Sequence, residues 1–225
     1  MTDLPTTDGA VPQPRLAASV ILLRDAPDGM EAFVQHRVST MDFAAGMVVF
    51  PGGRIDPADR TGWDYPEELL LRHAADWTQS SIGDDPDEAA RNAGTVLTAA
   101  IREVQEEAGL SIQATHLRPW ANWITPMDMP KRFDTYFYIA KPAPGAAPQH
   151  QTTEAWQSLW MPVAGILEAE AAGTLKLMPP TYYLLKEIAG FRTVGEVWSA
   201  EHEVVPVLAP VGSLTAFLKE RQNRH

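Results

Sequence analysis

The stretch Ala99–Leu110, AAIREVQEEAGL, carries the strongest signal in this sequence. As a helix, it places Glu103, Glu106 and Glu107 three and four residues apart, so that their carboxylates share one face. Like charges at this spacing repel, and a hard divalent cation, which prefers oxygen ligands and bridges carboxylates to phosphates, would relieve the repulsion. The alternative is a solvated helix face that is partly neutralised by Arg102, four residues before Glu106.

A second signal is the corner Pro51-Gly52-Gly53, which follows the short apolar run Met47–Phe50. A Pro-Gly-Gly corner is typical of a tight turn. Glycine also lets a backbone carbonyl approach a metal ion or a phosphate closely, so the corner is a candidate for the same site.

The composition bounds the class of protein. With 225 residues, 45% of them hydrophobic and 21% charged, the chain is long enough to bury one large core. A net charge of -11 disfavours binding to nucleic acid or to an anionic membrane, because both would be repelled. The absence of cysteine excludes disulfides and thiolate sites.

No apolar run approaches the ~20 residues of a membrane span, and the N-terminus lacks a signal peptide, so we expect a cytoplasmic protein.

Apolar runs and turn signals predict the remaining elements. We expect strands at 16–24, 32–38, 47–50, 117–124, 133–140, 156–161 and 204–208, and helices at 67–77, 163–172, 181–189 and 213–221. Asp85 and Pro86 predict a helix start, and the stretch from there to Gly109 fits one helix or two, because Gly94 weakens its middle. Strands and helices mix without strict alternation, which favours a layered α/β fold with a mixed sheet. Residues 1–14 predict a flexible tail.

Together these motifs resemble the Nudix hydrolases, whose pattern is Gly, five residues, Glu, seven residues, then Arg-Glu-apolar-any-Glu-Glu-any-Gly-apolar. Arg102–Leu110 matches the second half at every specified position, and the glycine corner represents the first half. Gly53 and Arg102 are 49 positions apart, about 35 more than in the family pattern. The residue eight before Arg102 is Gly94, so we expect the family's first glutamate, which pairs with the motif arginine, to be missing.

The long insertion and two further stretches resemble one subgroup of this family. VVFPGGRIDPADR at Val48–Arg60 and TPMDMPKRFDTYF at Thr125–Phe137 are similar to the subgroup that includes the mammalian peroxisomal coenzyme A diphosphatase. The resemblance implies a single Nudix-type α/β/α sandwich over 15–225, with a central mixed sheet and a mainly helical insertion at about 56–94. Because about 35 residues are too few for an independent core, we expect Trp63, Leu69–Leu71 and Trp77 to form a lid or a dimer surface.

The resemblance also implies the metal ligands. The Gly52 carbonyl, Glu103, Glu106 and Glu107 would hold Mg2+ or Mn2+. Glu103 is also the first candidate for the base that activates water, and Arg102 belongs to the same catalytic group.

The sequence signals for the remaining candidate site residues are weaker than the helix motif. Glu154, six positions before Trp160, is the second candidate base, although an ordinary loop glutamate fits equally well. The basic residues that we expect around the substrate phosphates are Arg37, Arg54, Lys131 and Arg132, each of which is otherwise a surface charge.

The implied activity is metal-dependent hydrolysis of a nucleoside diphosphate linked to another moiety, with coenzyme A or an acyl derivative favoured. ADP-ribose or NADH could replace it, and nothing in the residues separates these substrates. A catalytically silent Nudix-fold binding module is the alternative from another class, and a nucleic-acid decapping or repair enzyme is disfavoured by the charge. The expected partners are a small-molecule diphosphate and a second copy of the chain, with neither nucleic acid nor membrane.

Overall fold

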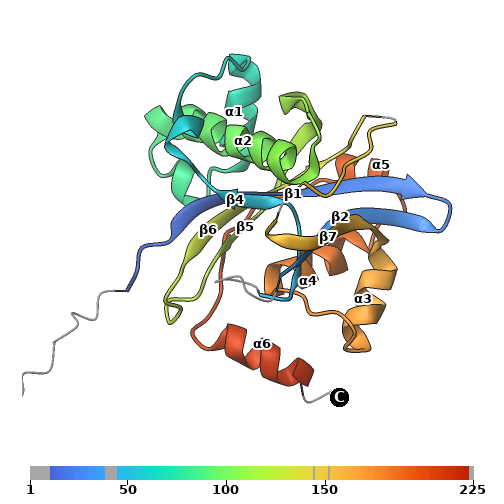
Figure 1. Ribbon diagram of the computed structural model, residues 1–225. Helices are drawn as coiled ribbons and strands as arrows, with labels where there is room; N and C mark the ends of the chain where they lie inside the picture. Colours follow the sequence, from blue (N-terminus) through green and yellow to red (C-terminus); the bar gives the residue numbers. More distant parts are fainter. Residues whose placement is uncertain (1–10, 39–44, 144, 152, 223–225) are drawn as a thin grey trace, which may run out of the picture.

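The computed structural model describes residues 11–38, 45–143, 145–151 and 153–222 (Figure 1). Most of the tail expected at 1–14 therefore lies outside the described residues, among which the first regular element begins at Arg15.

Within the described residues, eight strands form one mixed sheet in the order β3-β2-β1-β6-β5-β8, with β4 paired to β1 and β7 paired to β2. The β1–β6 and β5–β8 pairs are parallel and the others are antiparallel. The strands are β1 Arg15–Ala26, β2 Gly29–Arg37, β3 Val48–Val49, β4 Gly52–Arg54, β5 Leu117–Ile124, β6 Phe133–Ala140, β7 Ala155–Pro162 and β8 Val207–Leu208. The last of these is shorter than the strand expected at 204–208.

Helices cover both faces of this sheet (Figure 1). Helices α1 and α2 lie on one side, and α3, α4 and α5 lie on the other, which confirms the expected α/β/α sandwich. The α-helices are α1 Glu67–Asp76, α2 Pro86–Ala108, α3 Val163–Ala171, α4 Pro179–Ile188, α5 Val194–Ser199 and α6 Ser213–Gln222. Short 3-10 helices are η1 Pro57–Arg60, η2 Ser81–Gly83 and η3 Ala114–His116.

The strand β6 separates two hydrophobic cores. Tyr136 and Tyr138 pack in the core beneath α1 and α2, whereas Phe137 and Ile139 pack in the core beneath α3 and α4. Because successive side chains of a strand point to opposite faces, an uninterrupted apolar strand such as β6 requires cover on both sides.

Helix α2 is one helix of 23 residues. It begins where the sequence predicts, since the Asp85 carboxylate accepts a hydrogen bond from the Asp87 N–H at 3.1 Å and Pro86 occupies the first turn. It ends at Gly109, whose φ of 62° is the left-handed conformation of a C-terminal cap. The site-bearing half of α2 is therefore the C-terminal end of a long, continuous rod.

Gly94 lies in the middle of α2 because an aromatic ring occupies the space beside it. A Cβ atom at this position would lie 2.7 Å from the Trp63 ring. Trp63 stacks on Tyr65, and the Tyr65 hydroxyl is 3.1 Å from the Thr98 hydroxyl on α2. The glycine that weakens the helix locally thus allows the inserted segment to pack on it.

The inserted segment belongs to the core of the domain. Leu69 and Trp77 are 3% and 0% exposed, and the Trp77 ring packs edge-on against Tyr136 and Tyr138 of the sheet. The expectation of a lid or a dimer surface is therefore wrong for Leu69, Leu70 and Trp77, which are buried. Trp63 packs against Gly94 of α2, and Leu71 is largely exposed.

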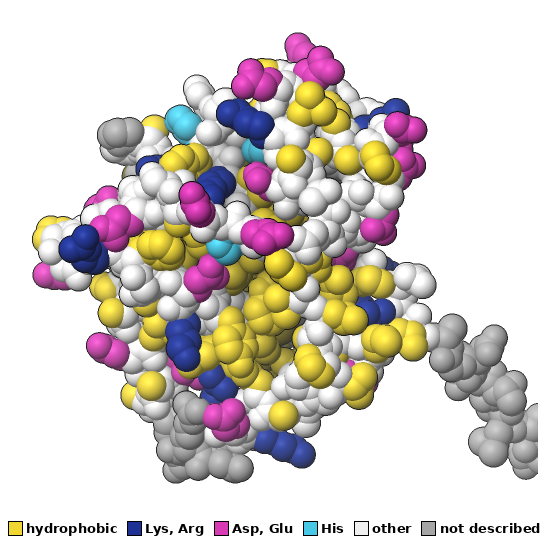
Figure 2. Space-filling model, turned by 180° about the vertical axis from the view of Figure 1, so that it is seen from behind, with side chains coloured by type: hydrophobic (Ala, Val, Ile, Leu, Met, Phe, Trp, Pro, Cys, Tyr) yellow, Lys and Arg dark blue, Asp and Glu magenta, His cyan; other side chains and the backbone are white. Residues whose placement is uncertain are grey.

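The surface carries a large apolar area on one side. Figure 2 shows apolar side chains gathered over the lower half of the rear face, with charged side chains around them. None of the helices in the described part of the chain is long and apolar enough to cross a membrane.

Candidate active site

The carboxylates of α2 form the centre of the site. Glu103 and Glu107 are buried, at 8% and 6% exposure, whereas Glu106 lies on the exposed edge of the same helix face. Glu106 and Glu107 follow Glu103 by three and four residues in one continuous helix, so the predicted helical arrangement of these glutamates is confirmed.

The glycine corner closes over these carboxylates. The Gly52 N–H donates a hydrogen bond of 2.8 Å to Glu107 Oε2, and a Cβ atom at Gly53 would overlap the Glu103 carboxylate. A residue with any side chain would therefore displace Glu103, which explains why glycine stands there. The fold thus brings together two parts of the motif that are about 50 positions apart in the sequence.

Arg102 organises the surrounding charges. Its guanidinium donates to both Asp59 carboxylate oxygens at 2.9 Å, to Glu103 Oε1 at 2.8 Å and to Glu106 Oε2 at 3.0 Å. It also donates to the Arg54 carbonyl at 3.0 Å. This paired geometry with Asp59 is the strong form of an arginine–carboxylate contact, and it restrains the arginine on the helix face.

Asp59 corrects the expectation that the first acidic residue of the motif is missing. Its side chain is 2% exposed and is the partner of Arg102. Counting back from Arg102 leads to Gly94, but counting forward from Gly53, past five residues, leads to Asp59. The insertion therefore lies after the acidic position, and the forward count is the signal that would have identified this residue.

The turn η1 holds Asp59 in place. Asp59 Oδ2 accepts a hydrogen bond of 2.8 Å from the Asp56 N–H, as part of a capping box at the start of η1. The short turn η1, which begins shortly after β4, thus supplies the acid that a glutamate supplies in the family pattern.

The electrostatics of the site show an excess of negative charge. Burial raises the pKa of Glu107 to about 7, although the hydrogen bond from Gly52 lowers it, and the neighbouring Glu103 raises it further. Burial also raises the pKa of Glu103, against the effect of Arg102. Bonding to Asp59 raises the pKa of Arg102 above its usual range. One guanidinium therefore serves three acids, and the two buried glutamates are incompletely compensated.

These donors fit a divalent cation. Buried carboxylates with raised pKa values, and a glycine corner that no side chain can fill, are suited to a hard ion with oxygen ligands. No group of three acidic or histidine side chains in the described ranges is already arranged to hold a metal. The carboxylates of Glu103 and Glu106 instead accept hydrogen bonds from Arg102, which draws them away from a shared metal position.

Arg37 and Glu154 lie beside Glu107. Their side chains bond to each other at 2.9 Å, and both influence the pKa of Glu107, which Arg37 lowers and Glu154 raises. The structure therefore brings two further candidate residues to this site, from β2 and from the turn that leads into β7.

The other basic candidates do not lie at the carboxylates. Arg132 is 8% exposed and donates to the carbonyls of Thr125, Pro126 and Pro12, so that it holds the start of β6. Lys131 precedes it in the same connection. The Arg54 side chain lines a separate cavity beside η1, although its carbonyl contacts Arg102.

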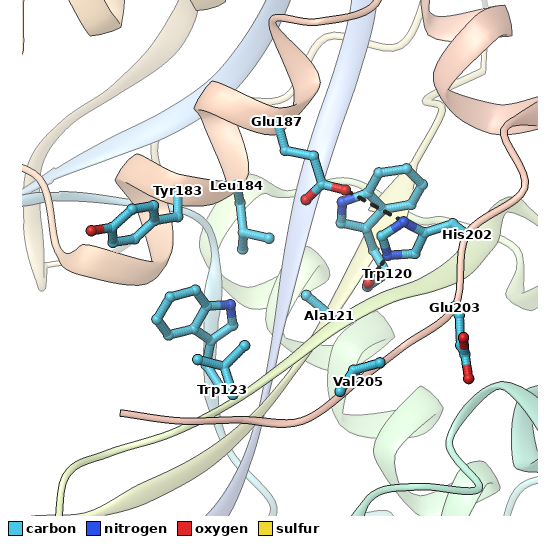
Figure 3. Close-up of a pocket in the computed structure, with 10 residues that line it drawn as sticks. Trp120, Ala121, Trp123, Tyr183, Leu184, Glu187, His202, Glu203 and Val205 are labelled. Carbon is cyan, nitrogen blue, oxygen red and sulfur yellow. Dashed lines mark hydrogen bonds and ion pairs between the residues drawn. The ribbon is translucent and has the colours of Figure 1, made fainter. Parts of the chain in front are cut away.

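A smaller cavity of about 170 Å³ lies between β5 and α4, on the opposite face of the sheet (Figure 3). Trp123 and Tyr183 stack at one side of it, and His202 lies flat against Trp120 and pairs with Glu187 at 3.4 Å. The glutamates of α2 lie on the other side of the sheet, so this cavity is not part of the site.

Known proteins resemble this chain over most of its length. A family model described as the NUDIX domain matches residues 13–180. "Putative nudix hydrolase 7" of Caenorhabditis elegans is 27% identical over 185 residues, which are 78% of this chain and 60% of that protein. This chain thus spans about 60% of the length of that relative.

Solved structures are similar in fold. A NUDIX hydrolase from Alicyclobacillus acidocaldarius has a TM-score of 0.66 and 24% identity, over 86% of this chain and 99% of that one. The NUDIX domain of Shewanella oneidensis NrtR, solved with ADP ribose, has a TM-score of 0.52 and 15% identity, over 80% and 88% of the two chains. At these identities the likeness concerns the fold alone.

Proposed function

Because the chain belongs to the NUDIX family, we propose that it is a hydrolase that cleaves a nucleoside diphosphate linked to another moiety, with the help of Mg2+ or Mn2+. Coenzyme A or an acyl-coenzyme A is the substrate that we favour. Its cleavage gives a 3′,5′-bisphosphate nucleotide and a phosphopantetheine. The observation that carries the proposal is the glutamate face of α2, closed by Gly52 and ordered by Arg102.

In this proposal, the carboxylates of Glu103, Glu106 and Glu107 and the Gly52 carbonyl hold the cation. A divalent ion there would offset the charge of the diphosphate oxygens and increase the acidity of water. Arg102 keeps Glu103 and Glu106 on one side of the helix, because a single Nη1 atom donates to both.

The chain's own base removes the proton from the attacking water. As the water oxygen bonds to phosphorus, the bridging P–O bond breaks and the proton passes to a carboxylate. Glu103 is our first assignment, because burial raises its pKa and so makes it a better proton acceptor than a solvated glutamate. Glu154, which bonds to Arg37 near Glu107, is the second.

The test is turnover of coenzyme A, acyl-coenzyme A, ADP-ribose and NADH with Mg2+ or Mn2+ by the wild type and by Glu106→Gln and Glu107→Gln. Both variants should lose most of the activity. Glu88→Gln is the matched control, because this exposed glutamate lies on the first turn of the same helix. Equal turnover by the wild type and the two site variants would refute the proposal.

The same assay separates the two bases. Glu103→Gln should lower kcat by roughly 10²-fold or more, the usual effect of removing a general base. A loss of that size in Glu154→Gln, with a smaller one in Glu103→Gln, would transfer the role to Glu154.

The substrate panel also separates the alternatives. ADP-ribose is included because the Shewanella oneidensis domain was solved with it. A higher kcat/KM for ADP-ribose than for coenzyme A would reassign the substrate. Tight binding without product at saturating metal would indicate a silent binding module.

A further inference from the structure

A second cavity borders the candidate active site. It has a volume of about 460 Å³ and lies where the start of β1, the end of β4 and the turn η1 meet. Three arginines line it, Arg15, Arg54 and Arg60, together with one acid, Asp56.

The three guanidinium groups are available to a ligand. The side chains of Arg15, Arg54 and Arg60 are exposed and make no hydrogen bond, ion pair or ring contact with any residue that the structure describes. Elsewhere in that part of the chain, arginines such as Arg24 and Arg118 are bonded to carboxylates or carbonyls. The chain as a whole has a net charge of -11, but these three arginine side chains give the cavity a local positive charge that attracts anions.

The cavity is connected to the carboxylates by short stretches of backbone. The Arg54 carbonyl accepts a hydrogen bond from Arg102, and Arg60 directly follows Asp59, the buried partner of Arg102. A substrate whose diphosphate lies at Glu103 therefore has this cavity as a neighbour.

We propose that this cavity is a subsite for a phosphate monoester of the substrate, distinct from the diphosphate that is cleaved; this inference rests on the proposed function. Guanidinium groups bind phosphate oxygens through paired N–H donors. A phosphate monoester carries about -1.5 to -2 charges at pH 7, which matches three arginines and Asp56. Coenzyme A carries such a monoester on its ribose, whereas ADP-ribose and NADH do not. The subsite would thus select the substrate within the class.

The first experiment compares coenzyme A with 3′-dephospho-coenzyme A, which lacks the monoester. For the wild type we expect a KM for the dephosphorylated substrate that is higher by roughly tenfold or more, the effect of losing charge-assisted hydrogen bonds. In a variant that combines Arg15→Gln, Arg54→Gln and Arg60→Gln, the ratio of the two KM values should approach one. Arg192→Gln, at an exposed arginine of the opposite layer, should keep the wild-type ratio. An unchanged ratio in the triple variant would overturn the subsite.

The second experiment needs no turnover. Calorimetric titration with adenosine 3′-monophosphate and with adenosine should show tighter binding of the phosphate by the wild type and equal binding by the triple variant. The same affinity of the wild type and the triple variant for the phosphate, or no preference for it in the wild type, contradicts the inference. If the preference is present but none of the diphosphates is cleaved, the proposed function fails while the subsite stands.

Discussion

Asp59 shows how much of the site depends on one residue outside the helix that carries the glutamates. It accepts two hydrogen bonds from Arg102, which in turn donates to Glu103 and Glu106. The carboxylates are therefore positioned through Asp59, and their arrangement depends on a residue that is 43 positions away from Arg102 in the sequence.

The substitution Asp59→Asn should lower kcat by roughly 10–100-fold, as is usual for residues that orient ligands rather than bind the reacting group. The amide cannot accept both N–H donors of Arg102, so the guanidinium loses its fixed position. Steady-state kinetics and melting curves of purified protein measure this. Asp64→Asn, at an exposed residue of the same inserted segment, is the control. A kcat within twofold of the wild type for Asp59→Asn would mean that Arg102 is positioned by other contacts.

At the scale of elements, α2 serves two purposes. Its C-terminal half carries the glutamates, and its N-terminal half supports the insertion through Gly94 and the ring of Trp63. A weak helix former is retained there because the packing of the ring requires the space.

This packing predicts that the effect of Gly94→Ala on the free energy of unfolding has opposite signs with and without the Trp63 ring. Gly94→Ala in the wild type should lower the free energy of unfolding, because the added Cβ meets the Trp63 ring. In a Trp63→Ala background, the same change should raise it by about 1 kcal/mol, the usual helix advantage of alanine over glycine. Urea unfolding of the four proteins of this cycle measures the coupling. Stabilisation by Gly94→Ala in both backgrounds would show that the contact does not limit the position.

At the scale of the whole molecule, the insertion shares one core with the sheet. Trp77, Leu69 and His73 of the inserted segment are buried among residues of β6 and α2. The segment and the sheet should therefore unfold together. The homodimer and the cytoplasmic location remain predictions from the sequence.

His73 makes the stability of this unit depend on pH. Burial, with a smaller contribution from the Arg72 charge, lowers the pKa of His73 from 6.5 to about 4. Between these values the unfolded chain binds a proton that the folded chain does not, so stability rises with pH and is lost as the pH falls from 6.5 towards 4. The slope from this group is at most about 1.4 kcal/mol per pH unit.

Urea unfolding at several pH values between 4.5 and 7.5 tests this prediction. His73→Leu should remove that part of the slope, while His116→Leu, at an exposed histidine, should keep it. Buried acids such as Glu107 contribute with the opposite sign, so the difference between wild type and variant is the informative quantity. Equal slopes for the wild type and His73→Leu would contradict the assignment.

The parts of the fold that the sequence determined by itself are those set by short-range geometry. The start of α2 at Asp85, its end at Gly109 and the shared face of its glutamates follow from helix spacing and capping. The mixed sheet between two layers also followed from the order of the apolar runs.

Only the tertiary structure decided which distant residues meet. Arg102 forms an ion pair with Asp59 across the insertion. Arg132 donates hydrogen bonds to backbone carbonyls and does not reach the glutamates of the site. The physical reason is that these contacts depend on the path of the chain. A count along the sequence leads to Gly94 from one end of the motif and to Asp59 from the other, and the burial of Asp59 beside the Arg102 guanidinium decides between the two positions.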